Sequence, residues 1–270
     1  MKWSDEAYIH KGATVRQIEN RRRKHFKSAK RYALNALKKD YTKFLEQVKN
    51  AQSVEGIVDV IESVSLDERE TKRAIESIYV DTGKDFAKWT VENLKGAVKK
   101  SSDYYDDYMR RYVEEKTGEK IKSITTTTRK RAIAIAKKVV AQGLEQGLSI
   151  DDIAAMLKQH YYNDALYRSV RIARTEVIAA SNAGSLHGAL STGLAIKKVW
   201  LATKTGHTRD SHMLMDKQAA DMQDYFNVPV IGRNGIVEGT EKMLHPGDPQ
   251  GSPGNVINCR CTIVYERIKA

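Results

Sequence analysis

Apolar side chains return every three or four residues along most of the first 163 residues of the chain. Between residues 14 and 48, for example, Ile18, Ala29, Ala33, Leu37 and Phe44 mark one helical stripe, and many of the other positions hold lysine or arginine. No proline interrupts this pattern, because all four prolines lie after residue 228. A long stretch that lacks proline and is rich in Lys, Glu, Ala and Leu predicts helices joined by short turns.

Capping signals locate the ends of these helices. A Thr-x-x-Gln box at Thr14 and a Ser-x-x-Glu box at Ser65 each predict a helix start. Thr125–Thr128 and Ser149–Asp152 are expected to act in the same way, and Gly147 and Gly193 are suitable helix ends. The helices predicted from these signals cover residues 14–48, 53–62, 65–94, 125–146, 149–162 and 164–193.

The pattern changes after Gly193. A strand is expected around residues 197–203, then a polar turn at 208–212, a helical stretch, a loop rich in proline and glycine at 245–254, and a closing strand that ends near Val264. The predicted fold class is therefore α+β. A long proline-free helical region, residues 1–163, precedes a small α+β domain, residues 164–270.

Both cysteines of the chain, Cys259 and Cys261, stand in the closing segment. Residues two apart on a strand face the same side, so the two sulfurs would point together and Arg260 away from them. A disulfide is disfavoured, because Cα atoms at this spacing lie roughly 6.5–7 Å apart. Two readings stay open. The thiols are either half of a tetrahedral zinc site or small side chains in a core, and the spacing by itself favours the core.

The order of motifs in the last hundred residues is informative. It runs from a tryptophan-bearing strand through Thr-Arg-x-Ser-His and Pro-Gly-Asp-Pro to Asn-Cys-Arg-Cys. This order resembles the C-terminal domain of the Mu F-like phage head morphogenesis (minor head protein) family over roughly residues 165–265, with Arg174–Glu176 as the helical lead-in. The motif residues that carry the resemblance most directly are Trp200, Arg209, Asp248, Asn258 and Arg260.

The resemblance has implications for role and location. It implies a minor head protein that associates with the phage portal protein inside the capsid of the virion, next to packaged double-stranded DNA. A major capsid or scaffolding protein would be a further partner, and the host cytoplasm would be the place of assembly.

The resemblance also shifts the interpretation of the cysteines toward a metal. We expect Cys259, Cys261, His212 and Asp210 to hold a structural zinc ion, and we expect no other cofactor. Just before Thr208 the family usually carries an acidic residue, whereas this chain has Gly206–His207. His207 therefore offers itself as another ligand.

Charge is concentrated at the N-terminal end. The chain has a net charge of +12, and its first fifty residues hold 14 Lys and Arg against 5 Asp and Glu. Clustered cations on a helix are typical of contacts with DNA phosphates of any sequence, or with an acidic protein surface. The alternative is a solvated face without a partner. The predicted contact residues are Arg21, Arg22, Arg23, Lys24, Lys27, Lys30 and Arg31.

Familiar catalytic motifs are absent from the sequence. There is no phosphate-binding loop, HExxH motif or nucleophile elbow. The side chains that offer catalytic chemistry are Asp210, His212, Asp216, His245, Asp248, Cys259 and Cys261. Because two thiolates reduce the Lewis acidity of zinc, we favour a structural ion and a protein that is not an enzyme. The alternative is a metal-dependent nuclease that uses the same cluster. No apolar run reaches about 18 residues, so no membrane contact is expected.

Overall fold

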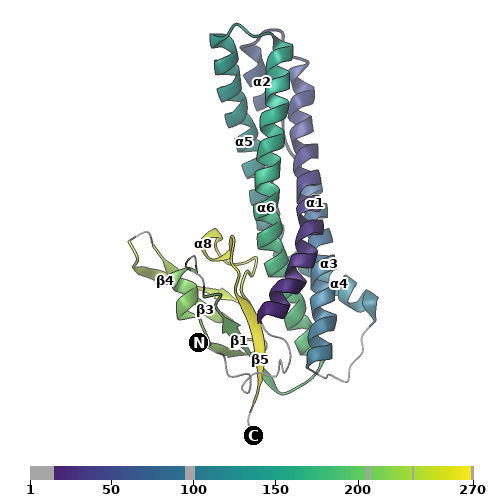
Figure 1. The fold of residues 1–270 in the computed structure, drawn as a ribbon, viewed down its shortest axis with the longest axis vertical. Helices are drawn as coiled ribbons and strands as arrows, with labels where there is room; N and C mark the ends of the chain where they lie inside the picture. Colours follow the sequence, from purple (N-terminus) through teal and green to yellow (C-terminus); the bar gives the residue numbers. More distant parts are fainter. Residues whose placement is uncertain (1–14, 95–100, 205, 207, 233, 269–270) are drawn as a thin grey trace. The chain divides into compact units, whose positions relative to one another are not determined.

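The computed structural model describes residues 15–94, 101–204, 206, 208–232 and 234–268 (Figure 1). The predicted α+β class is confirmed. The helices of the described chain are α1 (Val15–Val48), α2 (Gly56–Glu62), α3 (Arg69–Asn93), α4 (Ser102–Lys116), α5 (Gly118–Glu145), α6 (Ile150–Ser191), α7 (Asp210–Leu214) and α8 (Pro253–Val256). Its strands are β1 (Ile196–Leu201), β2 (Ala219–Asp221), β3 (Phe226–Ile231), β4 (Val237–Met243) and β5 (Thr262–Arg267).

The chain forms two compact units that are interleaved along the sequence. The sheet unit contains the residues up to 29, residues 76–117 and the residues from 173 onward, and the helical unit contains residues 30–75 and 118–172. Helices α1, α3 and α6 each contribute residues to both units. This arrangement differs from the predicted division at residues 163 and 164, because a long helix is able to carry its two ends into different cores.

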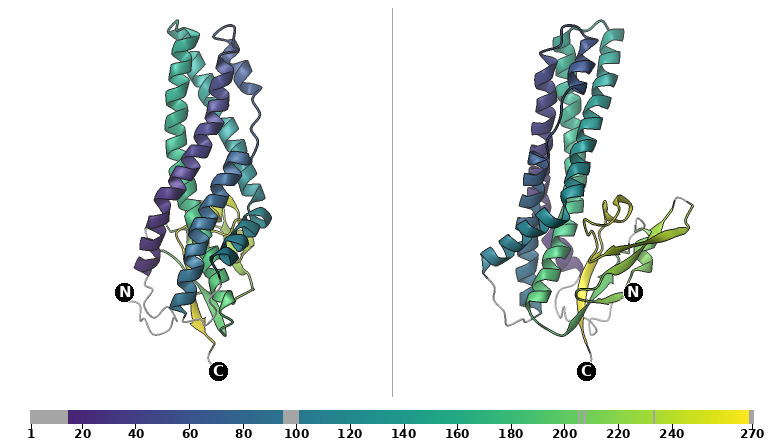
Figure 2. Two further views of the ribbon diagram at one scale, coloured as in Figure 1. Left: turned by 90° about the vertical axis from the view of Figure 1, so that its right-hand side faces the viewer. Right: turned by 180° about the vertical axis from the view of Figure 1, so that it is seen from behind.

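The helical unit is a bundle in which α2, α5 and parts of α1 and α6 lie side by side (Figures 1 and 2). Its core includes Leu37 and Phe44 from α1, Ile57 from α2, Val139 from α5 and Leu157 from α6. Leu37 and Phe44 belong to the apolar stripe of the first helix, so periodicity identified this face of α1.

Several predicted helix boundaries can be checked. The start at Ser149 is confirmed, because Ser149 Oγ accepts a hydrogen bond from Asp152 N at 3.2 Å. The start at Thr125–Thr128 is wrong, since these residues lie inside α5. The predicted break before Asp164 is also wrong, because Asp164 lies inside α6, a single helix of 42 residues. The Asp164 carboxylate accepts from Tyr41 and Arg131 within the helical unit instead of capping a helix. Thr14 lies outside the described residues.

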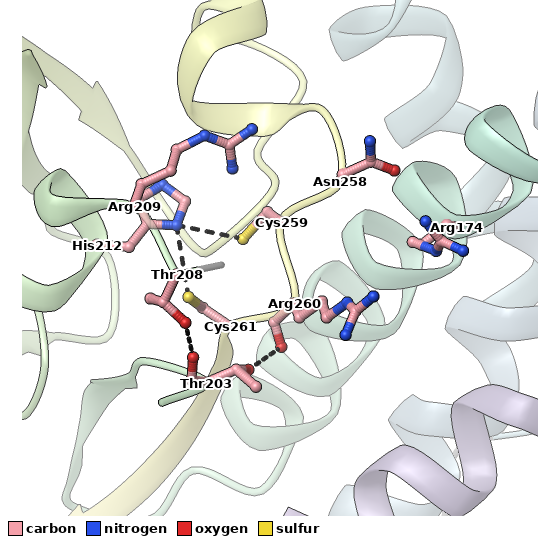
Figure 3. A pocket seen from close by; sticks show the side chains of 9 residues that line it. All are labelled: Arg174, Thr203, Thr208, Arg209, His212, Asn258, Cys259, Arg260 and Cys261. Atoms are coloured by element: carbon pink, nitrogen blue, oxygen red, sulfur yellow. Dashed lines mark hydrogen bonds between the residues drawn. The ribbon is translucent and has the colours of Figure 1, made fainter. Parts of the chain in front are cut away.

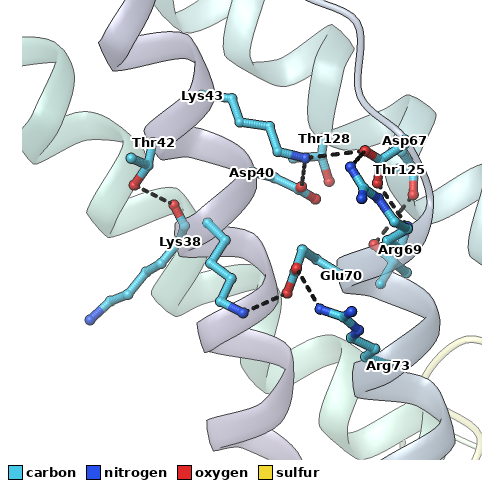
Figure 4. A network of polar contacts seen from close by, with 12 residues as sticks. Lys38, Asp40, Thr42, Lys43, Asp67, Arg69, Glu70, Arg73, Thr125 and Thr128 are labelled. Carbon is cyan, nitrogen blue, oxygen red and sulfur yellow. Dashed lines mark hydrogen bonds and ion pairs between the residues drawn. The ribbon is translucent and has the colours of Figure 1, made fainter.

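A polar network joins α1 to the start of α3 in the helical unit (Figure 4). Asp67 Oδ1 accepts from the backbone N–H of Arg69 at 3.0 Å, so α3 begins about one turn later than the sequence predicted. Lys43 Nζ lies 3.4 Å from Asp40 Oδ1 and 3.8 Å from Asp67 Oδ2. Asp40 is fully buried, and this burial raises the pKa of its carboxyl group to about 6.

The sheet unit contains an antiparallel sheet of order β2-β1-β5 and a separate hairpin of β3 and β4. Trp200 on β1 lies opposite Ile263 on β5. The hairpin extends away from the sheet (Figure 2). The helical stretch predicted after His212 is wrong, because α7 ends at Leu214 and strands β2 to β4 follow. Phe226 and Val228 are buried whereas Asn227 between them is exposed, which is the two-residue period of a strand.

Glycines bring α3 and α6 unusually close within the sheet unit. A Cβ atom added at Gly184 would lie 2.0 Å from the carbonyl oxygen of Gly83, and one at Gly188 would lie 2.4 Å from that of Ala87. The two helices therefore pack backbone against backbone along this line. Thr90 Oγ1 donates to Ser185 Oγ at 2.9 Å on the same interface.

Candidate metal centre

Three buried side chains of the sheet unit converge where the resemblance placed them. His212 Nδ1 lies 3.7 Å from Cys259 Sγ and 3.5 Å from Cys261 Sγ (Figure 3). The donor atoms of the three residues all lie within 4.8 Å of one another, and each side chain is at most 2% exposed. Asp210, the fourth predicted ligand, is exposed and does not join the cluster. Two positions apart on a helix, Asp210 and His212 face different directions.

The cysteines precede the strand on which the sequence placed them. Strand β5 starts at Thr262, so Cys259 and Cys261 lie in the segment that leads into it. The predicted alternation of buried and exposed side chains is nevertheless correct, because both cysteines are buried and Arg260 between them is exposed. Asn258 begins this segment in the left-handed region with φ of 58°, and its N–H donates to Thr175 Oγ1 at 3.1 Å. Helix α6 thereby fixes the start of the cysteine segment.

Arg22 of α1 supports the same segment. Its guanidinium group donates to Ser181 Oγ at 2.8 Å and to Asn182 Oδ1 at 2.9 Å, and it lies within hydrogen-bond reach of the carbonyl oxygen of Cys261. The side chain is 7% exposed, and burial lowers its pKa to about 10. Arg22 was predicted to contact DNA; that prediction is wrong, because its donors are used inside the sheet unit.

The two thiols differ in acidity. The hydrogen bond from Cys259 lowers the pKa of Cys261 to about 4, with His212 adding to the effect. That hydrogen bond, together with burial, raises the pKa of Cys259 well above its ordinary value. The geometry therefore favours one thiolate beside His212. Thiolate is the form of cysteine that binds metals.

This donor set fits zinc. Two sulfurs and one imidazole nitrogen are ligands that zinc prefers, and three protein ligands are the number typical of a zinc ion whose fourth position is open. Among the described residues, no fourth His, Cys, Asp or Glu joins the cluster. His207, which the sequence offered as a further ligand, lies outside the described residues. The predicted zinc stays a prediction with three ligands assigned.

A pocket of about 300 Å³ opens above the cluster (Figure 3). Its walls come from α6, from the segment after β1, from the start of α7 and from the cysteine segment. The lining residues other than the cluster are Arg174, Thr203, Thr208, Arg209, Asn258 and Arg260. Sequence reasoning placed Arg174 in the helical lead-in and missed its position in this pocket. Its position in the Arg174–Glu176 lead-in was the available signal. Its neighbour Glu176 turns away and accepts from Tyr79 Oη at 3.2 Å.

The remaining motif residues build the surroundings of the cluster. Trp200 packs edge-on against the His212 ring at 5.4 Å between centroids. Asp248 is buried and holds its own loop by accepting from the backbone N–H groups of Leu244 and Gln250, at 2.7 and 3.0 Å.

Two members of the broader catalytic set have other contacts. His245 Nε2 lies 2.9 Å from Tyr112 Oη, and Asp216 forms an ion pair with Lys204 at 2.8 Å. Neither belongs to the group that His212 forms with the two cysteines.

The other predicted contact residues lie along α1. Arg21 is half-buried and forms an ion pair with Asp85 at 2.5 Å. Arg23, Lys24, Lys27 and Arg31 are exposed, and Lys30 is half-buried. Apart from Arg22, these cations of α1 therefore remain a candidate surface for an anionic partner. The ion pair with Asp85 partly neutralises the charge of Arg21.

Comparison with known proteins finds a family similarity in the C-terminal half of the chain. Residues 134–264 match the family described as phage Mu protein F-like protein. The resemblance predicted from the motifs is thereby confirmed, and the match begins about thirty residues earlier than residue 165. The Mu F-like region thus includes part of α5, all of α6, the sheet and the metal-ligand cluster.

A curated relative adds an unexpected observation. The protein named NAD(+)–arginine ADP-ribosyltransferase EFV, from Enterococcus faecalis (strain ATCC 700802 / V583), is 30% identical over 129 residues. These residues are 46% of this chain and 24% of that protein, so the chain matches only about a quarter of the relative's length. No solved structure is significantly similar to the chain.

The expectation that the protein is not an enzyme is overturned by this similarity. Part of the chain is shared with a protein that is named as an enzyme, so the lack of familiar motifs is no ground for excluding catalysis. The expected absence of membrane contact remains untested. Within the described residues, no helix is both long and apolar enough to cross a membrane.

Proposed function

We propose that this protein is a minor component of the phage head, associated with the portal protein inside the capsid and in contact with packaged double-stranded DNA. The observation that carries the DNA contact is the exposed basic surface of α1. Arg23, Lys24 and Lys27 are exposed, and Lys27 follows Arg23 by four residues and Lys24 by three, which places it one turn along the helix from both. Lys30 and Arg31 continue the series of cations along the helix.

Salt dependence tests this DNA contact. Each phosphate neutralised by a cation releases a counterion, so affinity falls steeply as salt rises, with a slope of about −0.9 per contact on a log–log plot. We expect duplexes of unrelated sequence to bind equally well. Reversing three charges in Arg23→Glu/Lys24→Glu/Lys27→Glu should weaken binding at least tenfold and reduce the slope by about 3.

A matched variant controls for net charge. Lys122→Glu/Lys130→Glu/Lys138→Glu reverses three exposed charges on α5 and should retain most of the affinity. Equal losses in both variants would contradict a contact through α1, as would binding that persists unchanged in high salt.

Association with the portal is tested in assembled particles. The chain should be found by mass spectrometry in purified heads, and heads that lack the portal protein should lack it too. Its recovery from portal-free heads at the normal copy number would contradict the proposed location.

We also propose a zinc ion at His212, Cys259 and Cys261. When bound, the ion would join α7 to the segment before β5 and so stabilise the sheet unit. The three protein ligands hold their donor atoms within 4.8 Å of one another, and each side chain is at most 2% exposed.

A second candidate function is that of a metal-dependent nuclease. Two observations favour it. The cluster supplies three protein ligands, and catalytic zinc sites keep their fourth position open. The pocket beside the cluster is lined by arginines. Incubation of plasmid with the purified protein and a panel of divalent ions, with chelator and a His212→Asn variant as controls, tests it. Cleavage that needs both the ion and His212 would support it, and intact plasmid under every condition would dismiss it.

A further inference from the structure

The pocket above the metal-ligand cluster has an excess of positive charge. Three arginines, Arg174, Arg209 and Arg260, line a space of about 300 Å³, and no carboxylate lines it. Guanidinium groups stay protonated at every physiological pH. Like charges gathered around one cavity repel one another, so the arrangement is best stabilised when an anion enters.

These arginines are not used up by other partners. Within the described chain, neither Arg174 nor Arg260 has a carboxylate within ion-pair distance of its guanidinium group. Arg209 donates through Nη2 to the carbonyl oxygen of Ile257, which fixes its direction and leaves its other N–H groups available. In the view of Figure 3, Arg174 and Arg260 lie on the α6 side of the two sulfurs, and Arg209 lies near Cys259 on the other side.

The same walls carry neutral polar groups. The side chains of Thr203, Thr208 and Asn258 line the pocket with the arginines. Thr203 Oγ1 donates to the carbonyl oxygen of Arg260 at 2.7 Å, so the backbone beneath one arginine is held in place. Thr208 Oγ1 donates to the carbonyl oxygen of Thr203 in the same way, so both threonines hold the pocket wall in place beside the arginines.

We propose that this pocket binds a phosphate group carried by a ligand no larger than about a mononucleotide. Arginine pairs with phosphate and carboxylate in the same forked geometry, but a phosphomonoester carries a charge of about −1.5 to −2 at pH 7. A dianion therefore matches three cations better than a single carboxylate does. The volume of about 300 Å³ is at the lower end of the range for ligand pockets, which excludes larger ligands.

The proposed site is separate from the basic surface of α1. None of its residues belongs to the predicted contact series between Arg21 and Arg31, and the arginines do not depend on a metal for their charge. If the protein does not bind DNA through α1, the proposed phosphate site is unaffected. If the pocket does not bind phosphate, the proposed DNA contact is unaffected.

Calorimetric titration of the full chain tests the proposal. The probes are inorganic phosphate, a 5′-mononucleotide, and a trinucleotide with either a 5′-phosphate or a 5′-hydroxyl group; acetate serves as the carboxylate comparison. We expect the mononucleotide to bind at least tenfold more tightly than acetate, and both trinucleotides, which are larger than the pocket, to bind more weakly than the mononucleotide. Comparison with inorganic phosphate shows whether the nucleoside contributes.

Variants assign the contact. Arg174→Gln and Arg260→Gln should each weaken mononucleotide binding about tenfold or more, because each removes charge-assisted hydrogen bonds. Arg260→Lys should fall between Arg260→Gln and the unchanged protein, since it keeps the charge and loses the fork. Arg267→Gln removes an exposed arginine outside the pocket and should bind as the unchanged protein does.

Three results would overturn the proposal. The first is that no phosphate-bearing probe binds at millimolar concentration. The second is that binding is equal in Arg174→Gln, Arg260→Gln and Arg267→Gln, each checked for an unchanged melting temperature. The third is that chelator abolishes binding while the arginine variants leave it intact, because a metal and not the arginines would then hold the anion.

Discussion

Arg22 and Asn182 are joined by a buried hydrogen bond of 2.9 Å, although 160 residues separate them in the sequence. Asn182 also donates through Nδ2 to the carbonyl oxygens of Pro246 and Cys261, at 2.8 and 3.2 Å. The pair therefore links α1, α6, the proline loop and the cysteine segment inside the sheet unit. A residue that composition places among the DNA-binding cations is a support for the candidate metal centre.

Replacement of Arg22 tests this role. Arg22→Met should destabilise the protein by about 2–4 kcal/mol, because it leaves several buried acceptors without donors. Urea denaturation measures the loss. Arg23→Met is the matched control: Arg23 is exposed, so its replacement should change stability by less than about 0.5 kcal/mol. Equal effects of the two changes would contradict the assignment of Arg22 to the core.

Removal of the proposed zinc ligands should affect metal content and stability together. Native mass spectrometry should find one zinc ion per chain, and Cys259→Ser/Cys261→Ser or His212→Asn should lose it along with thermal stability. Chelation should lower the melting temperature of the unchanged protein toward that of the variants. His160→Asn, at an exposed histidine of α6, is the control and should keep both. A metal-free native protein would show that the three side chains are core residues without an ion.

The close contact between α3 and α6 predicts that replacing a helical glycine with alanine lowers the stability of the protein. Alanine normally stabilises a helix interior by about 0.5–1 kcal/mol relative to glycine. Gly184→Ala should instead destabilise by about 3 kcal/mol, because its Cβ would lie 2.0 Å from the carbonyl oxygen of Gly83. Gly118→Ala, at the start of α5, meets no atom within 4 Å and is the control. Thermal unfolding of both variants distinguishes crowding from helix propensity, and a stabilised Gly184→Ala would refute the close approach.

Asp40 should make stability depend on pH. Its pKa is about 6 in the folded protein, above the value of about 3.9 for an unfolded aspartate. The folded state therefore holds the proton more tightly, and stability falls as pH rises from about 4 to 6 because a buried carboxylate must ionise. Asp40→Asn should remove this fall and be more stable than the unchanged protein by roughly 2 kcal/mol at pH 8.

Denaturation curves at pH 4 and pH 8 measure this difference. At pH 4 the two proteins should be about equally stable. Asp67→Asn serves as a comparison, because Asp67 is exposed and its pKa is lowered by its hydrogen bonds with Arg69, which gives it the opposite dependence on pH. An Asp40→Asn variant that is less stable than the unchanged protein at pH 8 would show that the ion pair with Lys43 outweighs the cost of burial.

Local signals predicted those features that local contacts determine. Gly147 and Gly193 both adopt positive φ, at 65° and 66°, after the helices that they were expected to end. Thr125–Thr128 was misread as a helix start because threonine suits a cap, whereas Thr128 Oγ1 accepts from Arg168 Nη1 at 2.7 Å inside the helical unit. The local sequence around Thr128 cannot predict a contact with a residue forty positions away.

For Arg22 the sequence did contain a signal that the charge pattern hid. Ile18 precedes it by four residues, and Ala29 and Ala33 follow by seven and eleven, so Arg22 occupies the apolar stripe of the helix. The cysteine cluster was found through the order of motifs and not through spacing, which by itself favoured a core. The arginines of the pocket come from three separate segments, and only the fold brings them together.

The interleaved units have a consequence for synthesis. The helical unit is complete once residue 172 has been made, whereas the sheet unit also needs β5, about a hundred residues later. At about 5–20 residues per second, the first turns of α1 wait roughly another 5–20 s for β5 after the helical unit is complete. During that interval Arg22 is one more cation exposed to the nascent chain's surroundings. The segment that contains Cys261 and Thr262 completes the burial of this charge.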